Sequence, residues 1–591
     1  MNAQKRNLSR REFLIASACA CAGAAMLAGG CERGQKTVPL PPSTEAARSV
    51  NTPLAQAGKT SLPKISAGSP DLILKNGHIL TIDAANSKAQ AVAIKDGLIQ
   101  AVGSDASISK LAGDKTQIID VGQRVVTPGL IDPHIHVRAA GMNFIYYQPL
   151  LPPDVIDMQG LQRAIKDWLK GKPAGEWMQP YYMALKDGVP KKEDLDIVSP
   201  NNPVFLYHIS GHWGIANSAA LKIAGISAAT KDPPGGTIER DAKGEPTGVL
   251  YNHRAMDLLR KSAPPITDEI VSKGILAVQP ILAASGVTSF HDNNIRDLDT
   301  INIYRQLSQE GKLFLRNDLY YTLEWPADLD KAQKITPFTD ALAHFSGFKF
   351  LIDGSALTAY CHQPHEGSSW NMPTWDPAMY KKAVRTLHDL GLQVSVHCIG
   401  DAAVDLTLDA FEEAQNANPR PDPRHRIEHA ILTTPQATRR MKDLGVVMSA
   451  NPQFIFLFGD GYERLFSKSI DRIMVMREWL ESVHLTIGSD APSMPWYTPQ
   501  ATIAGAMSRI TYSKKVIGAD QTLKFEEALR AHTIGAAYAD HDETVKGSLE
   551  VGKFADIAVW SQDPTKASIE ELFKMAPMYM TLVGGKVVHQ G

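Results

Sequence analysis

The chain contains few cysteines. Its 591 residues include five, and three of these, Cys19, Cys21 and Cys31, lie close to the N-terminus. Only Cys361 and Cys398 remain in the body of the chain, and two thiols in a protein of this size exclude a disulfide framework. A bridge between Cys361 and Cys398 is the one intramolecular pairing that the body of the chain allows.

The chain also lacks an excess of charge of either sign. It has 61 basic and 63 acidic residues and a formal net charge of −2, which argues against nucleic acid as a partner. Hydrophobic residues make up 44% and charged residues 21%, values typical of soluble globular enzymes. No internal repeat is present, and a chain of this length predicts more than one domain.

The N-terminal segment differs from the rest. It contains the sequence NLSRREFLIASACACAGAAMLAGGC with the arginine pair Arg10–Arg11. SRREFL resembles the twin-arginine export signal of bacteria, which takes folded proteins across the membrane through the twin-arginine machinery. The apolar part is too short and too rich in alanine to favour a permanent membrane span. Residues 1–31 are therefore expected to be a signal peptide, and the protein is expected to act outside the cytoplasm, in the periplasm or on a lipid anchor.

The end of this segment leaves two processing routes open. LAGGC resembles a lipobox, which would make Cys31 the lipidated first residue of the mature protein. Leu27 lies one place further from the cysteine than in the commonest lipobox pattern. The alternative is ordinary cleavage by signal peptidase near this point. On either route, only the signal or the lipid anchor would contact the membrane.

The linker and the two ends of the remaining chain differ in amino-acid composition. Residues 32–68 are rich in Pro, Ser, Thr and Ala, which predicts a disordered linker. Both ends of the remaining chain, 69–127 and 545–591, contain short alternating apolar stretches around turns. Asn76–Gly77 and Asp96–Gly97 are hairpin signals between such stretches. Both chain ends are therefore predicted to be rich in β-structure.

The middle of the chain, 128–544, alternates apolar runs with amphipathic helical patterns. The runs include PVFLYHI, GVTSFHD, FKFLID, LQVSVHCIG, RIEHAIL and LTIGSD, and MYKKAVRTLHDLG is one of the helical patterns. The alternation predicts a parallel sheet, and the number of units predicts an α/β fold of the (β/α)8 barrel type. An open doubly wound sheet is the competing fold. The stretch 150–270 is too long for one strand–helix unit and predicts an insertion.

Residues that can bind a metal follow several of the apolar runs. In a barrel, the C-terminal ends of the strands meet at one mouth. His134 and His136 lie two positions apart, so in a strand their side chains share one face. Imidazole and carboxylate groups suit zinc and related metals. The series consists of His134, His136, Lys349, His397, His429 and Asp490.

Each of these residues has an ordinary structural interpretation when it is taken alone. A histidine in an apolar strand is most often a core residue, Lys349 would form an ion pair, and Asp490 would cap the next helix. Their occurrence at the ends of separate strand-like runs favours a common site instead.

The chain resembles the amidohydrolase superfamily of metal-dependent hydrolases from about residue 70 to its C-terminus. Within that superfamily it is similar to the branch of YtcJ-like proteins and N-substituted formamide deformylases, in amidohydrolase family 3. The motifs that carry the resemblance are PGLIDPHIH, GHWGIANSAAL, GEPTGVLYN, GVTSFHDNN, KFLIDGSALTAY, SVHCIGDAAVD, HRIEHA, GSDAP and GSLEVGKFADIAVW.

The resemblance implies both a fold and a metal site. The two β-rich chain ends would pair into a small β-sandwich beside the barrel. Lys349 would bridge two divalent ions, which are expected to be zinc. It would do so as a carboxylated lysine, because an ammonium group only donates hydrogen bonds and cannot bind a metal. If Lys349 is not carboxylated, a site for one ion remains open. The first ion would be held by His134, His136 and Asp490, and the second by His397 and His429.

The resemblance also implies a mechanism. A metal-activated hydroxide would attack the substrate carbonyl. Asp490 would take the proton from the water and deliver it to the leaving amine, as general base and then general acid. His212 in GHWGIANS matches a motif of the branch and would polarise or position the carbonyl, with a purely structural role as the alternative.

Other residues near the motifs have two interpretations. Asp353 is expected to orient the end of a strand rather than to take part in the chemistry. Trp213, Tyr360 and Trp496 either line an apolar pocket or pack loops over the barrel. Asp132 shares the face of the two histidines by strict alternation, but the family pattern leaves it outside the metal ligands.

The predicted function is hydrolysis of a C–N bond other than a peptide bond, in a small-molecule amide, N-acyl amine or N-formyl amine. A deaminase of the same superfamily is one alternative, but many such enzymes have a glutamate three residues after the histidine that corresponds to His397, and Gly400 stands there. A non-catalytic exported binding protein on the same fold is another alternative. A homodimer is compatible with the sequence.

Overall fold

The computed structural model describes residues 62–591 except 146–149, 151–153, 183–184, 186–187, 325, 341, 366–370 and 495–496. The predicted export signal with Cys31, most of the predicted linker and Trp496 therefore lie outside the described residues. Among the helices that are described, none combines the length and the apolar character needed to cross a membrane.

Eight parallel strands form the central sheet, in the same order in space as in the sequence. They are β8 (Leu130–Ile135), β14 (Val287–Ile295), β15 (Arg316–Leu323), β16 (Ala343–Leu351), β17 (Gln393–Cys398), β18 (Arg426–His429), β19 (Val447–Ala450) and β20 (His484–Ile487). The chain after β20 returns to β8, where the Asp490 N–H donates to His134 O at 2.7 Å and the His136 N–H donates to Ala491 O at 2.8 Å. This closure confirms the predicted barrel and excludes the open doubly wound sheet.

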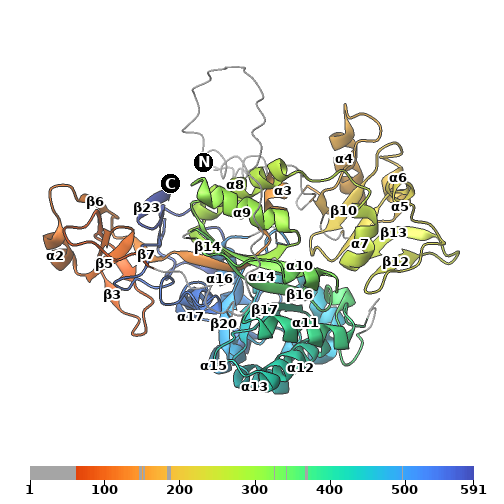
Figure 1. Cartoon of the computed structure of the whole chain (residues 1–591). Coiled ribbons are helices and arrows are strands. Elements are labelled where there is room, and N and C mark those ends of the chain that lie inside the picture. Colours follow the sequence, from red (N-terminus) through yellow and green to blue (C-terminus); the bar gives the residue numbers. More distant parts are fainter. Residues whose placement is uncertain are drawn as a thin grey trace, which may run out of the picture.

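Helices cover the outside of the barrel (Figure 1). The pattern MYKKAVRTLHDLG lies in α11, which begins with Pro377 after the N-cap Asp376. Its buried residues, which include Tyr380, Val384 and Leu387, recur at helical spacing and form one apolar stripe. The helices of the barrel segment include α3 (Val137–Ile145), α8 (Asp268–Ala284), α9 (Leu298–Gln309), α10 (Asp328–Ala332), α11 (Pro377–Asp389), α12 (Asp401–Ala417), α13 (Pro435–Asp443), α14 (Gln453–Leu465), α15 (Met476–Ser482), α16 (Pro499–Ser508), α17 (Phe525–Ala531) and α18 (Ile534–Ala539).

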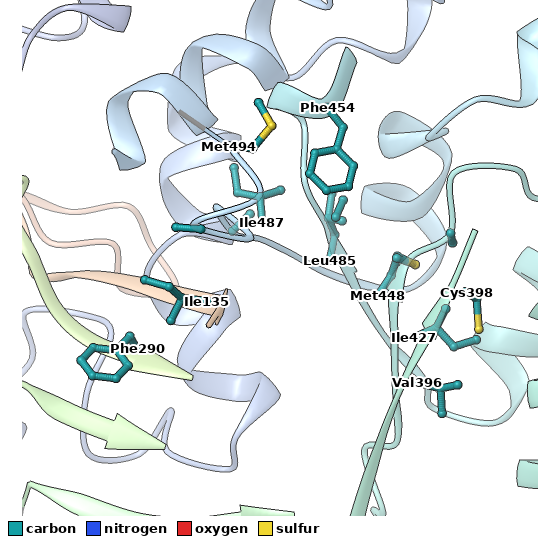
Figure 2. Close-up of a cluster of buried hydrophobic side chains, with 14 of the residues drawn as sticks. Ile135, Phe290, Val396, Cys398, Ile427, Met448, Phe454, Leu485, Ile487 and Met494 are labelled. Carbon is teal, nitrogen blue, oxygen red and sulfur yellow. The ribbon is translucent and has the colours of Figure 1, made fainter. Parts of the chain in front are cut away.

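The barrel strands alternate between apolar and polar side chains. Figure 2 shows part of the apolar set, with Val396 and Cys398 of β17 close to Ile427 of β18. The intervening residues of the same strands are polar and meet inside the barrel, where Ser395 of β17 donates to Glu428 of β18. Because all of these residues are buried, the polar interior must be satisfied by internal hydrogen bonds and ion pairs. Cys361 and Cys398 are both buried and form no bridge.

Two further sheets come from the chain ends, and in Figure 1 they lie on one side of the barrel. The strand β21 (Ile557–Val559) pairs antiparallel with β7 (Val125–Pro128), which continues through Gly129 into the first barrel strand. Apolar residues of both chain ends, such as Val92 and Leu582, share one core. The four-stranded sheet has the order β5 (Leu98–Gly103), β4 (Ala91–Lys95), β1 (Leu72–Lys75), β6 (Gln117–Asp120), and the six-stranded sheet has the order β23 (Lys586–Gln590), β22 (Met580–Val583), β21 (Ile557–Val559), β7 (Val125–Pro128), β2 (His78–Leu80), β3 (Lys88–Ala89).

The two predicted hairpin turns have different outcomes. Asp96 and Gly97 both have positive φ, at 54° and 78°, and join the antiparallel pair β4 and β5 as predicted. The hairpin predicted at Asn76–Gly77 is wrong, because β1 pairs with β4 and β6 while β2 pairs with β3 and β7. Only Asn76 has a positive φ there, so the backbone does not form a type I′ turn and the two strands enter different sheets.

The insertion lies on the other side of the barrel (Figure 1). It has its own sheet and two apolar cores of its own, one of which contains Trp213. Its strands, in spatial order, are β12 (Thr237–Arg240), β13 (Pro246–Tyr251), β11 (Trp213–Ala216), β10 (Phe205–His208) and β9 (Tyr181–Tyr182), and its helices are α4 (Met158–Leu169), α5 (Lys192–Asp196), α6 (Ser218–Ile223) and α7 (Asn252–Arg260).

Candidate metal centre

A cavity of about 330 Å³ lies between the C-terminal ends of the barrel strands and the insertion. The barrel contributes its floor, and Tyr181, Tyr207 and His253 of the insertion form part of its wall. All of the predicted metal-binding and catalytic residues line this one cavity, namely His134, His136, His212, Lys349, His397, His429 and Asp490.

Three of these residues form a compact group. The Asp490 carboxylate oxygen Oδ1 lies 3.1 Å from His134 Nε2 and 2.9 Å from His136 Nε2. His134 Nε2 and Asp490 Oδ1 are nevertheless buried atoms without a hydrogen bond among the described residues. A divalent cation between them would satisfy both atoms, so these residues fit a metal ion.

The charge states of this group also suit a metal. Burial lowers the pKa of His136 to about 4, so its imidazole is neutral at pH 7. Burial alone would raise the pKa of Asp490, but the adjacent histidines hold it well below its ordinary value. A neutral imidazole and an ionised carboxylate are the forms in which these side chains bind metals.

His134 is held in place by a residue that the sequence analysis did not identify. Its Nδ1 lies 2.6 Å from Oε2 of Glu428. The other oxygen, Oε1, accepts a hydrogen bond from Ser395 at 2.7 Å and pairs with Arg426 at 2.8 Å. Glu428 and Arg426 are both fully buried. A carboxylate on the far nitrogen of a metal-binding histidine fixes its orientation and raises its basicity.

Backbone conformation explains why strand alternation did not reveal Glu428. Glu428 and His429 are adjacent in β18, so strict alternation would place them on opposite faces. His429, however, has a φ of 70°, which turns the end of the strand so that both side chains reach the interior of the barrel. Asp490 has a φ of 54°. Strained backbone of this kind at two candidate ligands is typical of functional sites.

The two histidines proposed for a second ion also lie in the cavity but outside the compact group. The ring of His429 lies 4.8 Å from that of His134 and 4.6 Å from that of His397. His429 Nδ1 bonds to Asn451 Oδ1 at 2.6 Å, which leaves its Nε2 as the ligand atom. His397 Nε2 bonds to the Gly354 carbonyl at 2.9 Å, so its Nδ1 would have to serve.

Lys349 is buried in β16, and its Nζ has no hydrogen-bond partner among the described residues. Burial lowers the pKa of Lys349 to about 8. The neutral amine, which is the form that adds CO₂, is therefore more accessible than in an exposed lysine. A buried amine without a hydrogen bond is unfavourable, and chemical modification or a bound ion would remove this cost.

Lys349→Met is expected to stabilise the protein after treatment with a chelator. A thioether of similar length would replace a buried amine that lacks a hydrogen bond, for a gain of about 1–3 kcal/mol in the free energy of unfolding. Lys546→Met is the matched control, because Lys546 is equally buried but its Nζ contacts Asp318 at 2.8 Å and Asp542 at 3.0 Å. Urea denaturation should show a loss of about 3–5 kcal/mol for the control. A comparable loss for Lys349→Met would contradict this account.

His212 reaches the cavity from the insertion, just before β11. Its ring lies 4.4 Å from that of His397 and 5.2 Å from that of His253. Burial lowers the pKa of His212 to about 3, so the ring is neutral at pH 7. A neutral imidazole beside the metal group can donate one hydrogen bond to a carbonyl oxygen without adding charge.

The two other acidic residues near the site bind the backbone. Asp132 Oδ1 accepts the N–H groups of His134 and Ser489 at 3.3 and 2.9 Å. Asp353 accepts the N–H groups of Ile399 and Gly400, both at 2.9 Å through different oxygens. Both carboxylates therefore orient strand ends.

Two of the three predicted aromatic residues, Trp213 and Tyr360, are not among the residues that line the cavity, and the third, Trp496, lies outside the described residues. Trp213 stacks on His208 inside the insertion, with ring centroids 4.2 Å apart, and Tyr360 is absent from the wall. The aromatic wall consists of Tyr181 and Tyr207 instead, whose rings stack at 5.4 Å. No local sequence signal distinguishes these tyrosines.

Gly400 leaves no room for a side chain. A Cβ atom at this position would lie 2.0 Å from the Tyr360 carbonyl oxygen. Two such atoms cannot come this close unless the backbone moves. The glutamate that many deaminases of the superfamily have at this position therefore has no place in this backbone.

Several known proteins resemble this chain over most of its length. The model of the amidohydrolase family matches residues 117–589. The N-substituted formamide deformylase of Arthrobacter pascens is 28% identical over 85% of this chain and 95% of its own length. The YtcJ protein of Bacillus subtilis is 27% identical over 88% of this chain and 99% of its own length. The crystal structure of an uncharacterized metal-dependent hydrolase from Pyrococcus furiosus is 25% identical, with a TM-score of 0.65 over 84% of this chain and all of that one.

Proposed function

Because this chain belongs to the amidohydrolase family, we propose that it is a metal-dependent hydrolase of C–N bonds other than peptide bonds, with an N-acyl or N-formyl amine as substrate. The observation that carries the proposal is the buried group of His134, His136 and Asp490 at the floor of a cavity, with unsatisfied atoms that face one another. The similarity to a formamide deformylase supports the bond type.

The residues that would hold the metal follow from the donor set. His134, His136 and Asp490 would bind one ion, and His429 with His397 would bind a second if Lys349 is carboxylated and bridges them. Two or three imidazoles with a carboxylate suit zinc. When bound, the metal lowers the pKa of water toward about 7 and polarises a carbonyl oxygen.

The side chains of the chain would then complete the reaction. Asp490 accepts the proton of the attacking water while the C–O bond forms, and donates it to the amine nitrogen while the C–N bond breaks. His212, neutral and above the metal group, is placed to donate a hydrogen bond to the carbonyl oxygen. Glu428 holds His134 in its ligand orientation.

The experiment is an assay of purified protein, loaded with zinc, on a panel of N-formyl and N-acyl amines. We expect release of the free amine, loss of activity with a chelator, and recovery when zinc is restored. Activity that survives complete removal of the metal would overturn the proposal. Tight binding of an amide by a protein that contains no metal would favour the non-catalytic binder.

We also propose that the protein is exported by the twin-arginine route, with Cys31 as a lipid anchor. The support is the sequence SRREFL with Arg10–Arg11 and the LAGGC segment. Replacement of both arginines by lysine is expected to retain the full-length precursor in the cytoplasm, as cell fractionation would show. Normal export of the double variant would contradict the route.

A further inference from the structure

Three arginines line the cavity, and the proposed reaction uses none of them. Arg138 follows the first barrel strand in α3, Arg296 follows β14, and Arg260 ends α7 of the insertion. Besides them, the charged side chains among the described lining residues are Lys349 and Asp490. Asp490 is therefore the only acidic residue among the described residues that line the cavity.

Each arginine is held by one carboxylate that lies behind the cavity wall. Arg138 Nη1 pairs with Asp297 at 2.6 Å, and Arg260 Nη1 pairs with Asp257 at 3.0 Å. Arg296 Nη1 pairs in the same way with Glu324 at 3.1 Å. These carboxylates are not among the lining residues. Each ion pair holds a guanidinium group in position through Nη1, and Arg296 Nη2 also contacts His253 at 3.2 Å. Groups held in this way lose less entropy when a ligand binds.

Each of the three ion pairs lies within one part of the fold. Asp257 and Arg260 both belong to α7, and Arg138 and Asp297 both belong to the barrel, as do Arg296 and Glu324. None of the three ion pairs thus joins the insertion to the barrel.

All three arginines line the same cavity as Tyr181. Burial raises the pKa of Tyr181, and the positive charges of Arg260, Arg296 and Arg138 all oppose that rise. Tyr181 stacks on Tyr207, and the Arg260 guanidinium lies 5.3 Å from the centre of the Tyr207 ring.

Arg296 lies near the candidate metal ligands. Arg296 Nη2 is 3.2 Å from His253, the His253 ring is 5.2 Å from that of His212, and His212 is 4.4 Å from His397. Two imidazole rings thus separate Arg296 from a candidate ligand. Apolar residues complete this part of the wall, including Met142, Pro264, Pro265 and Ile266.

We propose that Arg138, Arg260 and Arg296 form a carboxylate-binding subsite, and that the substrate is an amide with a carboxylate on a hydrocarbon or aromatic body. Guanidinium groups bind carboxylates through paired, charge-assisted hydrogen bonds. An uncharged amide of the same shape would shield the guanidinium groups from water without accepting hydrogen bonds from them. Binding of such an amide is therefore disfavoured. The inference rests on the proposed amide hydrolysis.

The test uses N-formyl ω-amino acids of increasing chain length, each paired with the N-formyl alkylamine of the same length. For the zinc-loaded enzyme, kcat/KM is measured for both members of each pair, and their ratio is the readout. Calorimetry with the chelator-treated protein measures binding of the same compounds without turnover. We expect the carboxylate to be preferred by about 10- to 100-fold at the chain length that spans the cavity.

The variants are Arg260→Gln, Asp257→Asn and Arg240→Gln. Arg260→Gln should reduce the ratio of the two kcat/KM values by about 10-fold or more. Asp257→Asn leaves the Arg260 guanidinium in place and should retain the preference for the carboxylate. Arg240→Gln is the matched control, since Arg240 lies in the same insertion, pairs with Asp232 at 2.9 Å and does not line the cavity.

The outcomes separate the two proposals. Hydrolysis of both members at equal rates, or a preference for the uncharged member, overturns the subsite and leaves amide hydrolysis intact. If neither member is hydrolysed but the carboxylate binds and Arg260→Gln abolishes that binding, the subsite stands and the proposed reaction fails. If neither member is hydrolysed or bound, the subsite is overturned as well.

Discussion

Replacement of Asp490 by asparagine is expected to lower kcat/KM for the N-acyl or N-formyl amine by about 10³- to 10⁴-fold. Asparagine has nearly the same shape but cannot accept the proton of the attacking water or return it to the amine. It also removes the negative charge that faces His134 Nε2 and His136 Nε2 at 3.1 and 2.9 Å. Steady-state kinetics and the metal content of the purified variant measure the two effects separately.

Asp353→Asn is the matched control for this prediction. Asp353 is as deeply buried as Asp490 but accepts backbone N–H groups of Ile399 and Gly400. Its replacement is expected to lower the free energy of unfolding by about 1–3 kcal/mol. The ion at His134, His136 and Asp490 should be retained, because the candidate ligand beside Asp353 is His397, at 3.6 Å. If Asp490→Asn keeps more than a tenth of the activity at full metal content, Asp490 is not the proton carrier.

Replacement of Glu428 by glutamine is expected to have the largest effect on stability. Arg426 Nε lies 2.8 Å from Glu428 Oε1, and both side chains are fully buried. Loss of the carboxylate would leave a buried guanidinium without its counter-charge, at a loss of about 3–5 kcal/mol in the free energy of unfolding. Since Glu428 also bonds to His134, metal affinity should fall by about 10- to 100-fold.

The pH dependence of this effect follows from the depressed pKa of Glu428. Burial alone would raise that pKa, but the charges of Arg426 and His134 and the neighbouring Lys349 hold it well below 4.5. A carboxylate whose pKa is lower in the folded state stabilises that state fully above the unfolded value, and the contribution is lost as the pH falls through the folded value. The difference between wild type and variant should therefore be constant from pH 5 to 8 and shrink only in stronger acid.

A double variant separates the two roles of Glu428. Arg426→Met with Glu428→Leu removes both buried charges together, and apolar pairs of similar volume often replace such ion pairs without loss of stability. We expect this variant to recover most of the unfolding free energy but not the metal affinity, because His134 Nδ1 still lacks its carboxylate. Recovery of both properties would show that Glu428 acts on the metal only through stability.

Much of the site could be predicted from the sequence because its residues lie in regular positions. His134 and His136 share a face because strand side chains alternate with a period of two. Lys349 and His397 lie near the ends of apolar runs that become barrel strands, and Asp490 follows such a run. Parallel strands bring their C-terminal ends to one mouth. Local pattern and fold class are thus enough to gather these side chains at one cavity.

Other features depended on backbone geometry that the pattern does not encode. Alternation alone would turn Glu428 away from the face of His429, and only the positive φ of His429 allows both to point inward. Asn76–Gly77 has the composition of a hairpin turn, yet the strands on either side of it join different sheets, because their partners come from elsewhere in the chain.

The sequence by itself determined the barrel, the β-rich chain ends and the series of metal-binding residues, because apolar periodicity and the order of the strands act over short distances along the chain. Only the tertiary structure decided that Tyr181 and Arg260 of the insertion line the same cavity as Arg138 and Arg296 of the barrel. Such residues carry no local signal, since their relation arises from the packing of segments far apart in the chain. The candidate metal ligands thus follow from the pattern, whereas the proposed choice of substrate depends on the packing of the insertion against the barrel.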